Sequence, residues 1–218
     1  MCLLVLKDKE ATIKEKYLKN AYDSNPDGVG YSFPHGDKLI TKKFRKYDKF
    51  LKNWNYDIKT FGSITPFLLH FRLATHGQNK GTLNVHPFNI RQGLVFAHNG
   101  IINEVDDDKK LSDTQVFNRD ILKNLKKSFL NDLILIKLIE GFIGSSKLAF
   151  LDSNGAYKIL NESLGHWEKG VWYSNSTYKH EPIRYSSNLY GGSYYGWDDD
   201  FGRERKRATE IVKYLPTK

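Results

Sequence analysis

The hydrophobic residues of this chain fall either into short continuous runs or into helical spacings. The continuous runs predict buried strands over 3–7 (LLVLK), 25–33, 64–73, 94–97 and 170–175. Apolar positions three and four residues apart predict helices over 11–22, 116–125 and 132–142. The segment 147–160, KLAFLDSNGAYKIL, predicts a hairpin because the turn-rich DSNG separates two apolar segments. Strands flank the helices at both ends of this pattern, so we expect an α+β fold.

Composition narrows this picture to a globular chain. Its 218 residues are 39% hydrophobic and 14% aromatic, which is enough for a sizeable core in one compact domain. The single cysteine, Cys2, cannot form an internal disulfide, so nothing demands an oxidising compartment. The apolar run Leu3 to Leu6 is too short for a signal peptide or a membrane span. We therefore expect a cytoplasmic protein that does not contact a membrane.

The chain is strongly basic, with a formal net charge of +9. Basic residues are dense from Lys38 to Lys59 and again from Arg203 to Arg207, RERKR. Such patches can bind nucleic acid or an acidic partner. The alternative is a lysine-rich solvated surface, which the abundance of Asn, Ile and Tyr favours. Nucleic-acid contact is therefore the less favoured interpretation.

Cys2 stands directly behind the initiator methionine. Removal of Met1 would leave one residue that carries both a thiol and a free α-amine. An ordinary α-amine has a pKa of about 7.7 to 8.0, so it can accept the thiol proton near neutral pH. The competing interpretation is that Cys2 is a small buried hydrophobe.

Polar residues follow two other predicted strands. Arg72 lies within the apolar LLHFRLAT, where an apolar residue or a paired ion is expected. Asn99 and Gly100 come directly after a second apolar run. Because strand ends deliver side chains to functional loops, these residues and Cys2 can converge.

Five segments in this order carry a family resemblance: MC, HFRLATHG, NVHPF, AHNGII and SDT. Together they resemble the glutaminase domain of class II glutamine amidotransferases, in the N-terminal nucleophile hydrolase superfamily. The resemblance implies a four-layer αββα sandwich of two mainly antiparallel sheets between helical layers. It covers Cys2 to about Asn175, so we expect a glutaminase-like domain over 1–180 and a basic, aromatic C-terminal extension over 181–218.

The resemblance also implies a role for each matching residue. Cys2 would be the nucleophile, and its α-amine would be the base. Asn99 and Gly100 would donate hydrogen bonds to the oxyanion, and Arg72 would bind the α-carboxylate of glutamine. Thr75 and His76 would line the same pocket.

The SDTQ segment allows two interpretations that are compatible. Ser112 and Gln115 have the spacing of a capping box at a helix start. The resemblance assigns Asp113 to the α-ammonium group of the substrate. Many relatives have Glu where this chain has Gln115. Glutamine also closes a capping box.

Two further segments also fit simple structural roles. Asn99-Gly100 is also a common hairpin turn. Asn25 to Gly30 has the composition of a turn, and whether Asp27 helps to shape the site stays open.

Four histidines raise the question of a metal site: His70, His76, His86 and His98. Their spacings fit no familiar zinc pattern, and no carboxylate recurs among them. We predict neither a metal nor a cofactor.

The main prediction is a glutaminase that hydrolyses glutamine to glutamate and ammonia through a cysteinyl thioester. No phosphosugar, nucleotide or ATP motif is present, so the expected partner is a separate ammonia-accepting synthase subunit. One alternative is a stand-alone amidohydrolase that cleaves another γ-glutamyl amide. The other is a non-catalytic binding module with the same fold.

Overall fold

The computed structural model describes residues 2–74, 81–106, 108 and 110–180, together with the backbone of 183–184 and 195–196. The chain divides into two units, Met1–His180 and Glu181–Lys218. In the second unit, β11 (Ile183–Arg184) pairs antiparallel with β12 (Tyr195–Gly196). The basic stretch from Arg203 to Arg207 lies outside the described residues.

The first unit contains two antiparallel sheets. The larger has the strand order β3-β2-β4-β1-β10-β9 and the smaller the order β5-β6-β7-β8. The larger sheet consists of β1 (Leu3–Lys7), β2 (Val29–His35), β3 (Lys38–Phe44), β4 (Phe67–Phe71), β9 (His166–Glu168) and β10 (Val171–Tyr173). The smaller sheet consists of β5 (Phe88–Arg91), β6 (Leu94–Asn99), β7 (Lys147–Asp152) and β8 (Tyr157–Leu160).

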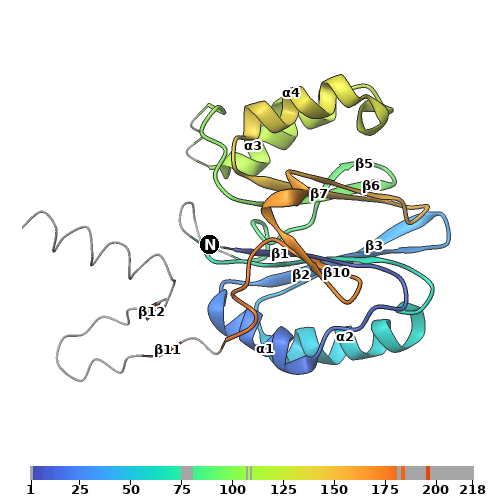
Figure 1. The fold of residues 1–218 in the computed structure, drawn as a ribbon, viewed down its shortest axis with the longest axis vertical. Helices are drawn as coiled ribbons and strands as arrows, with labels where there is room; N and C mark the ends of the chain where they lie inside the picture. The colour runs from blue at the N-terminus through green and yellow to red at the C-terminus, as the bar shows by residue number, and fades with distance from the viewer. Residues whose placement is uncertain are drawn as a thin grey trace, which may run out of the picture. The chain divides into compact units, whose positions relative to one another are not determined.

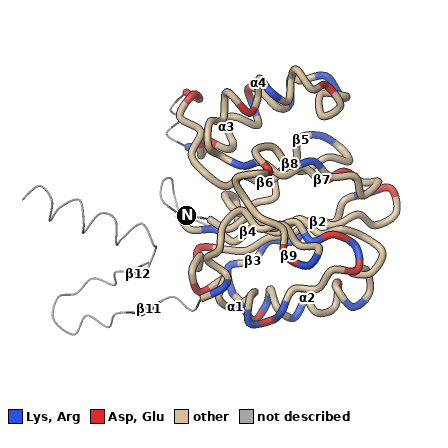
Figure 2. Tube along the Cα trace, in the orientation of Figure 1, with Lys and Arg blue, Asp and Glu red and all other residues tan. Residues whose placement is uncertain are grey.

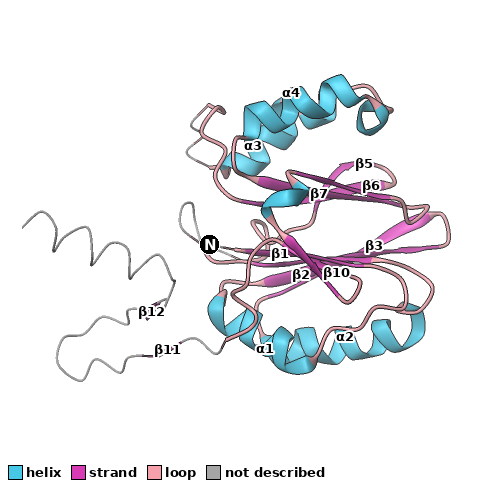
Figure 3. Cartoon of the chain, in the orientation of Figure 1, coloured by secondary structure: helices cyan, strands magenta, loops and turns pink. Residues whose placement is uncertain are grey.

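Helices cover the outer face of each sheet (Figures 1 and 3). Within the described residues, α1 (Glu15–Ser24) and α2 (Tyr47–Phe61) lie on the larger sheet, and α3 (Asp113–Asp120) and α4 (Leu133–Ile143) lie on the smaller one. Three short 3₁₀ helices complete the unit: η1 (Leu122–Asn124), η2 (Phe129–Asn131) and η3 (Glu162–Leu164). The expected α+β fold with its αββα layers is confirmed.

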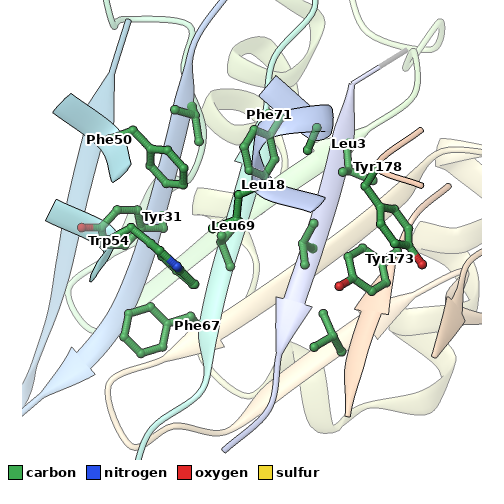
Figure 4. Close-up of a cluster of buried hydrophobic side chains, with 14 of the residues drawn as sticks. Leu3, Leu18, Tyr31, Phe50, Trp54, Phe67, Leu69, Phe71, Tyr173 and Tyr178 are labelled. Atoms are coloured by element: carbon green, nitrogen blue, oxygen red, sulfur yellow. The ribbon is translucent and has the colours of Figure 1, made fainter. Parts of the chain in front are cut away.

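The continuous apolar run of β1 is explained by burial on both faces. Successive side chains of a strand point to opposite faces, so Leu4 and Leu6 pack between the two sheets. Leu3 and Val5 point the other way, into the aromatic cluster beneath α1 and α2 (Figure 4). A third cluster, which includes Phe117 of α3, fills the space between the smaller sheet and its helices.

The structure corrects several predicted boundaries. The first helix is Glu15–Ser24 rather than 11–22. The helix predicted over 116–125 is instead α3, Asp113–Asp120, followed by η1. The predicted hairpin is β7 paired with β8.

Helix α2 was not predicted, because lysines dominate the segment around it. Its buried side chains include Phe50 and Trp54, four residues apart, and these lie on its inner face. Basic residues occur on both helical layers and in both sheets (Figure 2). No described helix is long and apolar enough to cross a membrane.

Candidate active site

Strand alternation places three of the predicted residues on the facing sides of the two sheets. Alternate residues of a strand point to the same face, so Cys2 shares a face with Leu4 and Leu6 of β1. Asn99 likewise shares a face with Val95 and Ala97 of β6. All four of these apolar residues pack between the sheets. Arg72 lies an even number of residues after Leu68 of β4, whose side chain packs in the same cluster between the sheets. The three residues therefore lie at one end of the layer between the sheets.

The thiol of Cys2 contacts the backbone at the end of β4. Its Sγ lies 3.4 Å from the carbonyl oxygen of Leu73 and 3.4 Å from the amide nitrogen of the same residue. Burial raises the pKa of the Cys2 thiol, an effect that the Leu73 hydrogen bond opposes. The resting sulfur is therefore protonated, and a nucleophilic role requires a base.

The carbonyl oxygen of Cys2 accepts two amide hydrogen bonds from other strand ends. Asn99 Nδ2 at the end of β6 donates at 2.6 Å, and Asn175 Nδ2 after β10 donates at 2.8 Å. Asn175 is itself fixed, because its Oδ1 accepts from the amide and the hydroxyl of Thr177. Cys2 is thus held by residues from β4, β6 and the segment after β10.

Arg72 is nearly buried, with 6% of its surface exposed. Burial lowers the pKa of its guanidinium, and the nearby Cys2 and Asp27 act in the opposite direction. The segment that carries Arg72 is fastened to Asp27: the Asp27 amide donates to the Arg72 carbonyl at 3.0 Å, and the Ala74 amide donates to Asp27 Oδ2 at 2.7 Å. Asp27 therefore shapes the site by holding the backbone on both sides of Leu73.

Gly100 continues from Asn99 in a conformation that favours glycine, with φ of +141°. A Cβ at this position would lie 2.2 Å from Ser146 Oγ, so the chain passes Ser146 too closely for a side chain. Ser146 Oγ in turn donates to the carbonyl of Ile101 at 2.9 Å. The backbone that leaves β6 is therefore closely constrained.

Within the described residues, Asn99 Oδ1 is buried without a hydrogen-bond partner.

Asp113 is the first residue of α3, and the predicted capping box at this helix start is confirmed. The Ser112 hydroxyl accepts from the Gln115 amide at 3.3 Å, and Gln115 Oε1 accepts from the Ser112 amide at 3.0 Å. Asp113 Oδ2 accepts from the amide of Ile102 at 2.9 Å, two residues beyond Gly100. The helix start and the exit from β6 are thus joined through this carboxylate.

A chain of polar contacts also connects Asp113 to β6. Asp113 Oδ1 accepts from the Thr114 hydroxyl at 3.2 Å, and that hydroxyl lies 2.8 Å from His98 Nδ1. The backbone amide of His98 donates to His86 Nδ1 at 3.0 Å. The His86 ring stacks on His70, with 4.0 Å between ring centroids.

These three histidines are buried, and burial is the main cause of their lowered pKa values. The pKa is lowered to about 3 for His70 and to about 4 for His98, and it also falls well below its usual range for His86. All three are therefore neutral at physiological pH. No group of three His, Cys, Asp or Glu residues in the described part of the chain could hold a metal ion.

Sequence reasoning missed Asn175 and the role of His98. Asn175 ends the apolar GVWYSN run, and a polar side chain at a strand end was the available signal. His98 was considered only as a metal ligand, because its contact with Thr114 depends on how α3 packs. Thr75 and His76 lie outside the described residues.

The assembled groups can support acyl transfer. A thiol, two amide-bearing strand ends and a buried guanidinium lie around one edge of the layer between the sheets. Asn99 Nδ2 has two hydrogens, of which the Cys2 carbonyl uses one. The other can stabilise a developing oxyanion.

Comparison with known proteins supports the fold. No family model matches the chain, and no curated protein matches it. Among solved structures, it is similar to the glutamine phosphoribosylpyrophosphate amidotransferase of B. subtilis, complexed with ADP and GMP, at a TM-score of 0.52 and 18% identity. That match covers 79% of this chain and 41% of the other.

A glutamine aminotransferase class-II domain protein from Silicibacter pomeroyi also matches, at a TM-score of 0.37 and 15% identity over 70% of this chain and 73% of that one. Of these two matches, only the first has a TM-score above 0.5, and at 18% identity it shows a shared fold. That fold is the one implied by the resemblance of the sequence motifs to class II glutamine amidotransferases.

Proposed function

We propose that this chain is a glutaminase that hydrolyses glutamine to glutamate and ammonia. The observation that carries the proposal is the environment of Cys2. Its sulfur contacts the backbone next to the buried Arg72, and its carbonyl is held by Asn99. A cysteine used only for packing has no need of such a polar, multiply hydrogen-bonded setting.

The proposal includes removal of Met1, because the mechanism uses the α-amine of Cys2 as the base. This amine takes the thiol proton as Sγ attacks the δ-carbonyl carbon of glutamine. The carbonyl π electrons move to oxygen and produce a tetrahedral oxyanion. The free Nδ2 hydrogen of Asn99 and the backbone N–H of Gly100 donate to this oxygen.

Collapse of the tetrahedral intermediate breaks the carbon–nitrogen bond. The α-ammonium of Cys2 returns its proton to the leaving nitrogen, so ammonia departs and a thioester remains. Water then attacks the thioester and gives its proton to the same α-amine. Expulsion of the sulfur and its reprotonation release glutamate and restore Cys2.

The remaining residues bind the amino-acid end of the substrate. A guanidinium binds a carboxylate through two parallel hydrogen bonds, so Arg72 takes the α-carboxylate. Asp113 takes the α-ammonium group, and its position is supported by the fixed start of α3. Thr75 and His76 line the pocket in this proposal.

We assign only the glutamine-hydrolysing half of an amidotransferase reaction to this chain. The chain covers 41% of the length of the B. subtilis amidotransferase chain that it matches. Ammonia would pass to a separate acceptor enzyme, since free ammonia is protonated in water and lost as a nucleophile.

The test is glutamine turnover by the purified protein, with its intact mass measured in parallel. We expect ammonia release, a mass that lacks Met1, and loss of turnover in Cys2→Ala. Asn99→Ala should lower kcat about 100- to 1000-fold with a smaller effect on KM, as expected for an oxyanion donor. Arg72→Lys should mainly raise KM, and Arg119→Lys, on the exposed side of α3, is the matched control.

Three results would contradict the proposal. Full activity with Met1 retained would exclude the α-amine as base. Turnover of a γ-glutamyl alkylamide but not of glutamine would favour the alternative amidohydrolase. A correctly folded protein that neither turns over glutamine nor reacts at Cys2 with an electrophilic glutamine analogue would favour the binding module.

A further inference from the structure

A cavity lies far from Cys2, at the opposite end of the smaller sheet. Its volume is about 570 Å³, within the range of about 300 to 1,000 Å³ that is usual for small-molecule sites. It is lined by the β5–β6 turn, the β7–β8 hairpin and the segment around η2. Leu94 and Asn99 are the two ends of β6, so about 17 Å of strand separates the cavity from the site at Cys2.

Arg91 is the fixed cationic group of this cavity. Its Nη2 donates to the carbonyls of Leu122 at 3.0 Å and Leu125 at 3.1 Å, and its guanidinium lies over the ring of Phe129. These contacts use one nitrogen of the guanidinium. The other N–H groups have no hydrogen-bond partner among the described residues, so they are available to bind an anion.

Two lysines add to the positive charge of the cavity. Lys127 and Lys158 line it from different segments, and neither has an ion-pair partner in the described part of the chain. Asp152 is the only carboxylate among the lining residues. Its Oδ1 accepts from the amides of Asn154 and Ala156, both at 2.9 Å, so one of its two oxygens is held within its own hairpin. The three cationic groups still outnumber this single carboxylate.

The cavity is also partly apolar. Leu94 and Leu130 contribute aliphatic surface, and Tyr157 contributes an aromatic ring. A ligand that fits must therefore combine at least two negative charges with a compact uncharged body. A phosphate monoester has this combination, and its oxygens match the fork of an arginine.

We infer that this cavity binds a small phosphorylated molecule, with Arg91 as the anchor and Lys127 and Lys158 as flexible partners. Nothing in the proposed glutaminase mechanism uses these residues. The site is therefore independent of that proposal, and the two can fail separately.

The test is calorimetric titration of the full chain with phenyl phosphate and with citrate at matched ionic strength. We expect saturable binding of phenyl phosphate and about tenfold weaker binding in the double variant Lys127→Gln/Lys158→Gln. Both lysines are exposed, so the fold should survive. The matched control is Lys52→Gln/Lys59→Gln, which removes the same charge from the exposed face of α2.

Each outcome decides the inference. Retained binding in the control and weakened binding in the cavity variant would support it. Equal weakening in both variants would show that only net charge matters and would overturn the site. Absence of saturable phenyl phosphate binding would also overturn it. Preference for citrate would overturn the assignment to phosphate.

Discussion

The buried histidine stack makes a quantitative prediction about acid stability. His70, His86 and His98 have lowered pKa values in the folded chain, about 3 for His70 and about 4 for His98. In the unfolded chain a histidine titrates at about 6.5, so the unfolded state binds more protons below that pH. The free energy of unfolding must therefore fall as the pH drops from about 6.5 towards the folded pKa values.

The size of this effect follows from the difference in pKa. Between about pH 7 and pH 5, His70 and His98 should each lower the free energy of unfolding by about 2 kcal/mol. Together they would remove about 4 kcal/mol, a large part of the 5 to 15 kcal/mol that is typical of a globular protein. The lowered pKa of His86 acts in the same direction.

The variant that isolates one contribution is His70→Phe. Within the described residues, neither ring nitrogen of His70 makes a well-formed hydrogen bond, so a phenyl ring retains the stacking on His86 and removes only a weak interaction with the His98 backbone. Urea denaturation across this pH range should give an acid-induced loss that is about 2 kcal/mol smaller in the variant. His35→Gln, at an exposed position, should behave as the unmodified protein. An identical loss in His70→Phe and the unmodified protein would refute the reasoning.

Three further predictions concern single positions. Lys7 is fully buried and its pKa is lowered to about 8, mainly by burial, so the free energy of unfolding should rise by about 2 kcal/mol between about pH 7 and pH 9.5. Urea denaturation of Lys7→Met should show a smaller rise over the same pH range. Gly100→Ala should lower the Tm, and adding Ser146→Gly should recover part of the loss, because the added Cβ meets Ser146 Oγ. Asn175→Ala should lower kcat for glutamine more than it changes KM, measured by ammonia release, because one of two donors that hold the Cys2 carbonyl is removed.

The features that the sequence predicted best are those determined by neighbouring residues. Continuous apolar runs identified β1 and β4, and the turn residues after Asp152 identified the hairpin of β7 and β8. The capping box depends only on Ser112 and Gln115, and it forms as predicted. Local chemistry was sufficient in each case.

The features that were missed depend on contacts between distant segments. The inner face of α2 is apolar, but the lysines between its apolar positions hid the pattern. Asn175 reaches the Cys2 carbonyl across 173 positions of sequence, which no local pattern reveals. His98 becomes a neutral, buried ring only because α3 covers the outer face of β6.

The position of Cys2 at the margin of the inter-sheet layer has a chemical consequence. Strand alternation that buries Leu4 and Leu6 also directs Cys2 towards the facing sheet, where burial raises the pKa of the thiol. A raised pKa keeps the sulfur protonated and unreactive towards incidental electrophiles. In the proposed reaction, the adjacent α-amine accepts the thiol proton as Sγ attacks, and Asn99 stabilises the oxyanion that this attack produces. The same packing that builds the core therefore makes attack by the sulfur depend on the α-amine.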